Sequence, residues 1–145
     1  MNIPRKLSLL VVDDAPTIVT LVSKMLQASL GDVLEVTALS DPGEAKKFLD
    51  SYCCDIVLSD IEMPETSGLE ILRLAKSRNA WTQVVFMTAH SSWDYLAEAI
   101  ENGATDYLLK PIDRSELVSV VSQCASRVTR WQRALRGSLR AVVQA

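Results

Sequence analysis

Five side chains that could support chemistry stand at or just after the ends of short apolar segments. They are Asp13 and Asp14 after 7–12, Asp60 after 56–58, Thr88 after 84–87, and Lys110 after 104–109. Ligands of α/β proteins bind beyond the carboxyl ends of parallel strands, so residues at these positions can share one crevice. Each also has an ordinary alternative role, as a helix cap, a strand residue or a surface charge. Their occurrence together favours a common site.

The residue types in this set predict metal-dependent phosphoryl chemistry. In one crevice, the carboxylates of Asp13, Asp14 and Asp60 would lie close together and repel one another by several kcal/mol. The cluster therefore requires a cation. An all-oxygen set without Cys or His suits Mg²⁺. With Lys110 and the Thr88 hydroxyl nearby, Asp60 could accept a phosphoryl group as an acyl phosphate. The metal and Lys110 would neutralise charge on the transferring oxygens, and Thr88 would donate a hydrogen bond to one of them.

The elements needed to position these residues can be predicted from hydrophobic pattern and capping residues. Strands are expected at 7–12, 33–38, 56–58, 84–87 and 104–109, the second being an edge strand with Leu34, Val36 and Ala38 on one face. Helices are expected to begin near Pro16, Asp41, Ser67, Ser91 and Asp113, with ends at Gly31 and Gly103 for the first and fourth. Strictly alternating strands and helices predict an α/β fold: a doubly wound, five-stranded parallel sheet of flavodoxin-like order 2-1-3-4-5 with an extended C-terminal helix.

The motifs resemble those of the response-regulator receiver domain of two-component signalling. The matching segments are Asp13-Asp14, Asp60-Ile61-Glu62-Met63-Pro64 followed by Gly68, Thr88-Ala89 and Lys110-Pro111, within 7–127. The resemblance implies that Asp60 is the phospho-acceptor and receives its phosphoryl group from a phosphohistidine on a sensor histidine kinase or phosphotransfer protein. It implies a phosphorylated signalling domain rather than an enzyme with a substrate of its own.

The resemblance also implies further roles at the site. Asp14, Asp60 and the backbone carbonyl of Glu62 would bind Mg²⁺, with Asp13 acting through water. Lys110 would pair with the phosphoryl group, and its bond to Pro111 would be cis. Thr88 and Tyr107 would form the switch, although Tyr107 could instead be an ordinary half-buried strand residue. Glu62 and His90 would tune the phosphoryl lifetime.

Two other functions compete with the receiver interpretation. A Mg²⁺-dependent phosphatase with an Asp nucleophile commonly has a second acid two residues later, and Glu62 stands there. A scaffold that is never phosphorylated is the other alternative, and the intact Thr88 and Lys110 argue against it.

The cysteines, Cys53, Cys54 and Cys124, lack metal-ligand spacing. The chain has no membrane-spanning run, and a cytoplasmic location is expected.

The C-terminal part of the sequence differs in charge from the rest. Residues 1–116 carry 10 basic and 18 acidic side chains, whereas 117–145 carry five Arg and no acid. Apolar residues follow at helical spacing, at Leu117, Val121, Cys124, Val128, Trp131, Leu135, Leu139 and Val142. We therefore expect a receiver at 1–126 and a helical extension at 127–145, which forms a homodimer or links to a further domain. The alternative is a helix that folds back or frays after Gly137. Neither nucleic acid nor membrane is expected as a direct partner.

Overall fold

The computed structural model describes residues 5–89 and 92–144 and contains the predicted alternation of strands and helices. The strands are β1 (Leu7–Val12), β2 (Leu34–Leu39), β3 (Ile56–Asp60), β4 (Gln83–Thr88) and β5 (Asp106–Leu109). The helices are α1 (Pro16–Leu30), α2 (Pro42–Ser51), α3 (Gly68–Arg78), α4 (Trp93–Glu101) and α5 (Arg114–Gln144). All strand pairs are parallel, in the order β2-β1-β3-β4-β5. The predicted fold class and strand order are confirmed.

Capping side chains mark the starts of α2 and α5, close to the predicted positions. The Asp41 side chain accepts a hydrogen bond from the Gly43 N–H at 2.8 Å, at the start of α2. The Asp113 side chain likewise accepts from the Glu116 N–H at 2.9 Å, at the start of α5. Each such bond satisfies one of the amides that a first helical turn leaves free. These starts fix the lengths of the loops that follow β2 and β5.

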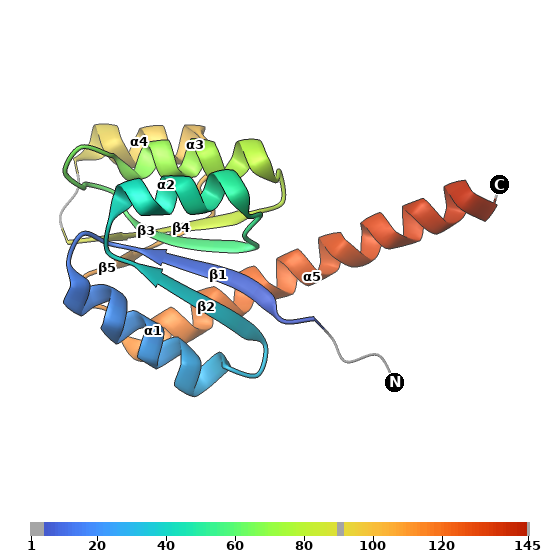
Figure 1. Cartoon of the computed structure of the whole chain (residues 1–145), viewed down its shortest axis with the longest axis horizontal. Coiled ribbons are helices and arrows are strands. Elements are labelled where there is room, and N and C mark those ends of the chain that lie inside the picture. Colours follow the sequence, from blue (N-terminus) through green and yellow to red (C-terminus); the bar gives the residue numbers. More distant parts are fainter. Residues whose placement is uncertain (1–4, 90–91, 145) are drawn as a thin grey trace.

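Two apolar cores lie on the two faces of the sheet. Helices α1 and α5 cover one face, and α2, α3 and α4 cover the other (Figure 1). Strands β1, β3 and β4 are buried along nearly their whole length, as expected for strands covered on both sides. No helix among the described residues is long and apolar enough to cross a bilayer.

Two strand predictions need correction. The strand β5 begins at Asp106 and not at residue 104, because the Ala104 N–H donates to the Ala99 carbonyl at 3.0 Å and closes the end of α4. The strand β2 spans Leu34–Leu39 and not 33–38. Leu34, Val36 and Ala38 share one face, as the alternation of side chains along a strand requires, but Ala38 at the end of that face is exposed. The strand continues to Leu39, whose side chain packs against the core on the opposite face.

The extended C-terminal helix is confirmed. Helix α5 runs without interruption through Gly137 to Gln144, and it projects well past the sheet (Figure 1). The alternatives of a helix that folds back on the domain or frays after Gly137 are therefore wrong. Its first half packs against the sheet and α1 through Leu117, Val121 and Cys124.

Candidate functional site

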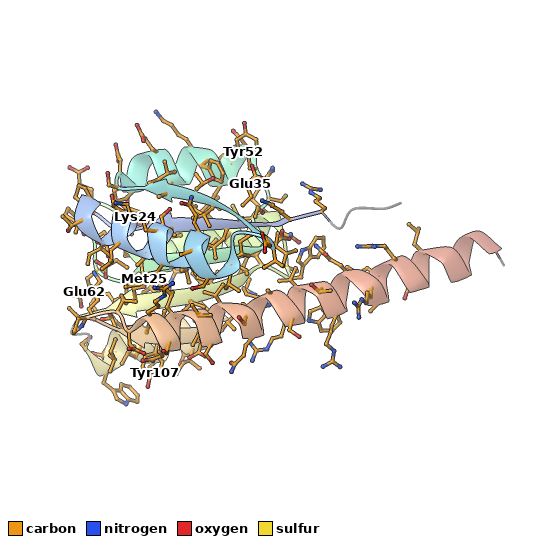
Figure 2. The ribbon with its side chains drawn as sticks, turned by 90° about the horizontal axis from the view of Figure 1, so that it is seen from below. Lys24, Met25, Glu35, Tyr52, Glu62 and Tyr107 are labelled. Atoms are coloured by element: carbon orange, nitrogen blue, oxygen red, sulfur yellow. The ribbon has the colours of Figure 1, made fainter. Side chains whose placement is uncertain are left out.

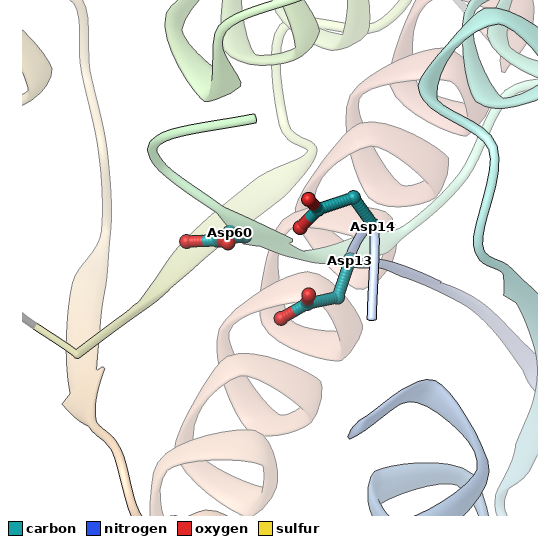
Figure 3. Close-up of side chains that lie close together, drawn as sticks. All are labelled: Asp13, Asp14 and Asp60. Carbon is teal, nitrogen blue, oxygen red and sulfur yellow. The ribbon is translucent and has the colours of Figure 1, made fainter. Parts of the chain in front are cut away.

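The strand ends bring the predicted chemical residues to one edge of the sheet. Asp13 and Asp14 follow β1, Asp60 ends β3, Thr88 ends β4 and Lys110 follows β5. Because these four strands are consecutive neighbours, the residues lie side by side. Carboxylate oxygens of the three aspartates lie within 4.8 Å of one another, and their side chains face a common space (Figure 3).

Backbone packing around Asp60 holds this arrangement in place. The Gly68 N–H, at the start of α3, donates to the Ile61 carbonyl at 2.8 Å. A Cβ atom at Gly68 would come within 3 Å of the Asp60 backbone oxygen and of the Phe86 ring, so only glycine permits this approach. On the other side, the Lys110 N–H donates to the Thr88 carbonyl at 2.8 Å. The Lys110–Pro111 bond is cis, as the resemblance implied.

Lys110 is the only basic group that the described residues bring to the three carboxylates. Its Nζ lies 2.6 Å from Asp13 Oδ2 and 3.4 Å from Asp60 Oδ2. Burial alone lowers the pKa of Lys110, but the two aspartates more than offset this, and the pKa is raised above its ordinary value. Lys110 therefore stays protonated beside the two carboxylates.

The ionised form of the Asp60 carboxylate is destabilised by its surroundings. Its pKa is raised above the ordinary Asp value, mainly because burial disfavours the charged form. The charge of Lys110 opposes this rise, whereas the neighbouring charge of Asp13 adds to it. A divalent cation would offset both the burial and the repulsion.

The donor set fits Mg²⁺. Asp13 is fully buried, and its Oδ2 accepts no well-directed hydrogen bond from the described residues, although Lys110 Nζ is close. The Asp13 Oδ1 is already used, because it accepts from the Ala15 N–H at 2.9 Å. Asp14 is exposed and Asp60 is buried, so the cluster opens to solvent on one side. Hard oxygen ligands with an open, solvated side match a small divalent ion that retains water.

A groove lies beside Thr88, between α4 and β5. It has a volume of about 630 Å³, and its lining includes Thr88, Leu96, Ile100 and Tyr107. Thr88 is buried, whereas the Tyr107 side chain is 53% exposed. Figure 2 shows Tyr107 on the side of the domain away from Tyr52. The sequence did not indicate this groove, because it depends on how far α4 stands from the sheet.

The side chains of two predicted site residues point away from the carboxylates, although the Glu62 backbone lies next to Asp60. Tyr107 occupies the expected strand but points outward in this structure, so it does not contact the acidic cluster. The Glu62 side chain is exposed in the loop after β3, at the end of the domain opposite to the one from which α5 projects (Figure 2). The predicted role of His90 concerns a residue outside the described ranges.

The fold and the site define an α/β domain whose strand ends present a carboxylate cluster, a lysine and a hydroxyl. Residues 9–122 match the family described as the response regulator receiver domain. The chain belongs to this family, whose members act in two-component systems.

Relatives among known proteins agree with this assignment. The chain is 37% identical over 122 residues to the DNA-binding transcriptional regulator NtrC of Escherichia coli K12, covering 84% of this chain and 25% of that protein. It is 32% identical over 114 residues to the response regulator protein PilR of Pseudomonas aeruginosa, covering 78% of this chain and 25% of that protein. The chain thus spans about a quarter of the length of these curated relatives.

Solved structures show the same fold. A CheY-like response regulator receiver domain protein from Methanospirillum hungatei superposes with a TM-score of 0.80 at 21% identity, covering 87% of this chain and 98% of that one. The chemotaxis protein CheY4 of Vibrio cholerae gives 0.74 at 27% identity, covering 83% of this chain and 99% of that one.

Proposed function

We propose that this domain receives a phosphoryl group on Asp60 in a Mg²⁺-dependent reaction and passes the signal on by changing its surface. The observation that carries the proposal is that the Asp60 carboxylate lies within 4.8 Å of the Asp13 and Asp14 carboxylate oxygens and 3.4 Å from Lys110 Nζ. An acceptor carboxylate needs a cation on each side of the charge that it gains. Here Lys110 supplies one cation, and the aspartates supply the ligands for the other.

In the proposed reaction, an Asp60 carboxylate oxygen forms a bond to phosphorus as the P–N bond of a donor phosphohistidine breaks. The histidine nitrogen keeps the electron pair of the broken bond, and Asp60 becomes an acyl phosphate. Later attack by water on phosphorus releases inorganic phosphate and restores the carboxylate. The donor would be a sensor histidine kinase or a phosphotransfer protein in the cytoplasm.

The side chains around Asp60 would divide the work of charge stabilisation. Asp14, Asp60 and the Glu62 backbone carbonyl would hold Mg²⁺, with Asp13 acting through a water molecule. The bound ion would neutralise charge on the phosphoryl oxygens. Lys110 would pair with one of those oxygens from the opposite side, since its Nζ already reaches Asp60 Oδ2.

The signal would leave the site through Thr88. Its hydroxyl would move to donate a hydrogen bond to the phosphoryl group, which opens space at the end of the groove beside β5. Tyr107, which is outward-facing and lines that groove, would then turn inward. The surface formed by α4, β5 and α5 would thereby change its shape and its partners.

Intact-mass measurement tests the phospho-acceptor directly. The full chain, incubated with acetyl phosphate and Mg²⁺, should gain the mass of one phosphoryl group, and this gain should disappear when EDTA is added. The Asp60→Asn variant should gain nothing. The matched control is Asp50→Asn, the same change at an exposed position of α2, which should be phosphorylated like the wild type.

Several outcomes would overturn this proposal. Phosphorylation of Asp60→Asn would place the acceptor elsewhere. Rapid release of phosphate without any phosphorylated protein, even on rapid quenching, would favour the phosphatase interpretation. An unmodified wild type whose folded state is still stabilised by Mg²⁺ would favour a scaffold that works without phosphorylation.

A further inference from the structure

The last part of α5 carries an apolar face that the domain does not cover. We call residues 129–144 of α5 the tail segment. Val128 is fully buried, and none of the residues from 129 to 139 is. Beyond it, Trp131 is 57% exposed, Leu135 49% and Leu139 64%. Figure 1 shows this segment projecting from the domain with no other element beside it.

The exposed face continues a pattern that already packs inside the domain. Apolar side chains alternate at spacings of four and three along the helix, at Leu117, Val121, Cys124, Val128, Trp131 and Leu135. The first four are fully buried against the sheet and α1. Spacings of three and four are the repeat of a two-stranded coiled coil, in which one seam of each helix faces the other. Trp131 and Leu135 extend this seam beyond the domain.

The arginines of the tail segment lie away from this seam. If Val128 and Leu135 are placed at a positions and Trp131 at d, then Arg130, Arg133 and Arg136 fall at c, f and b. These are the outer positions of a coiled coil. The positions that flank the seam are held by uncharged residues, namely Gln132, Ala134 and Leu139. Two such helices can therefore meet without placing like charges against each other.

We propose that a second copy of this chain covers the exposed face, through pairing of the two tail segments as a short coiled coil. The occupant must be apolar along its centre and must keep its positive charges outside the contact, and the tail segment itself has both properties. Because the segment is already helical as a continuation of α5, pairing bears no helix-nucleation cost. A nucleic acid or an acidic protein would instead contact the arginines on the opposite face. This inference does not depend on phosphorylation of Asp60.

Light scattering coupled to size-exclusion chromatography tests the pairing on the full chain, across micromolar concentrations. We expect a monomer–dimer equilibrium that moves toward dimer as concentration rises. We also expect added salt to favour the dimer, because arginines on the two tails repel each other over a Debye length of about 10 Å at 0.1 M salt. Salt screens that repulsion but does not weaken apolar burial.

A pair of triple variants identifies the surface that pairs. Trp131→Ala with Leu135→Ala and Leu139→Ala removes two seam residues and the apolar residue that flanks them, and should raise the dimer dissociation constant about 100-fold or more. The matched control, Arg130→Ala with Arg133→Ala and Arg136→Ala, introduces three alanines on the outer face and should dimerise as well as or better than the wild type. Far-UV circular dichroism should show α5 intact in both variants.

Three results would overturn the inference. They are a monomer at every concentration and salt, a dimer that high salt dissociates, and a dimer that the seam variant leaves unchanged. Phosphorylation by acetyl phosphate is measured in parallel on the same samples. If phosphorylation is absent and the dimer is retained, the result contradicts only the proposal that Asp60 is the phospho-acceptor. The proposal of tail pairing is therefore tested independently of it.

Discussion

At the scale of single residues, the Asp60 carboxylate combines burial, a like charge and an opposite charge within a few ångströms. Asp13 is fully buried beside it, and Lys110 compensates for only part of the negative charge. The raised pKa of Asp60 means that its ionised form is less favourable in the folded protein than in the unfolded chain. The site therefore reduces the stability of the metal-free protein at neutral pH.

Removing that charge should stabilise the metal-free domain. We expect Asp60→Asn to raise the free energy of unfolding in EDTA at neutral pH by about 1 kcal/mol, the usual size of a single-residue effect. A group with a raised folded-state pKa stabilises the folded state only while protonated, below its unfolded value of 3.8. That contribution is lost as pH rises through the folded-state pKa. The advantage of the variant should thus be full at neutral pH and vanish toward pH 3.8.

Urea unfolding at a series of pH values, with and without Mg²⁺, measures this effect. The ion should stabilise the wild type and have a smaller effect on Asp60→Asn, because the variant lacks one of the proposed ligands. Asp50→Asn, at an exposed position, serves as the control and should change neither quantity. A variant that is less stable than the wild type in EDTA at neutral pH would contradict the electrostatic account of the site.

At the scale of elements, the start of α3 is pressed against the strand that carries Asp60. A Cβ on Gly68 would approach the Asp60 backbone oxygen at 2.4 Å, and it would approach Ile61 Cα and the Phe86 ring at 2.8 Å each. Two of these three atoms belong to the backbone and cannot move without shifting the site loop. The position of α3 and the backbone geometry at Asp60 are therefore linked.

We expect Gly68→Ala to lower the free energy of unfolding by about 1–3 kcal/mol, the cost of overpacking a closely fitted contact. It should also slow the proposed phosphorylation of Asp60, because the displaced loop begins directly after Asp60 at the end of β3. Gly137→Ala provides the control, since nothing lies within 4 Å of a Cβ there. Alanine at that helical position should be neutral or stabilising by up to about 1 kcal/mol. Equal stability and equal phosphorylation rates for the two variants would refute the link.

The elements themselves were largely predictable from sequence, and so was the grouping of the site. Apolar runs and capping residues placed every helix start within a few residues, and the parallel order then brought Asp13, Asp60 and Lys110 together. Strand ends were less predictable. The Ala104 N–H donates to the end of α4 and does not take part in β5. The local sequence pattern does not distinguish these two hydrogen-bonding arrangements. The outward orientation of Tyr107 depends on the distance between α4 and the sheet, which a one-dimensional pattern does not contain.

At the scale of the whole molecule, the two cores enclose one thiol each. Cys54 is buried on the side of α2 and α3, Cys124 is buried on the side of α1 and α5, and Cys53 is exposed. Burial raises the pKa of Cys54 to about 12 and that of Cys124 to about 11. Since the thiolate is the reactive form, these two residues should be inert in the folded protein.

Thiol counting checks whether both cores are closed. A water-soluble disulfide reagent at mildly alkaline pH should modify one thiol rapidly in the native chain and three after unfolding in denaturant. The Cys53→Ser variant should show no rapid reaction in the native state. Rapid modification of a second thiol would mean that one face of the sheet opens to solvent more readily than its packing indicates.

The boundary between the receiver and the tail segment lies within one continuous helix, so packing and not secondary structure must define it. The predicted receiver end at residue 126 excludes Val128, although its side chain is fully buried in the core with α1. Between residues 129 and 139 most side chains of α5 are exposed. The core of the receiver therefore extends slightly further along α5 than the sequence pattern suggested.

Two truncations locate this boundary energetically. A chain that ends at Arg130 should keep the stability of the full chain to within about 1 kcal/mol, because the residues removed are mostly exposed. A chain that ends at Ser126 loses Val128 and should be less stable than the Arg130 chain by about 1.5–3 kcal/mol, the value of burying one such side chain. Both end in a carboxylate at the C-terminus of α5, so the unfavourable interaction with the helix dipole is common to the two. Urea unfolding at low protein concentration, where pairing of tails is negligible, gives the comparison. Equal stability of the two truncated chains would place the boundary at or before residue 126 and would mean that the buried Val128 contributes nothing to the core.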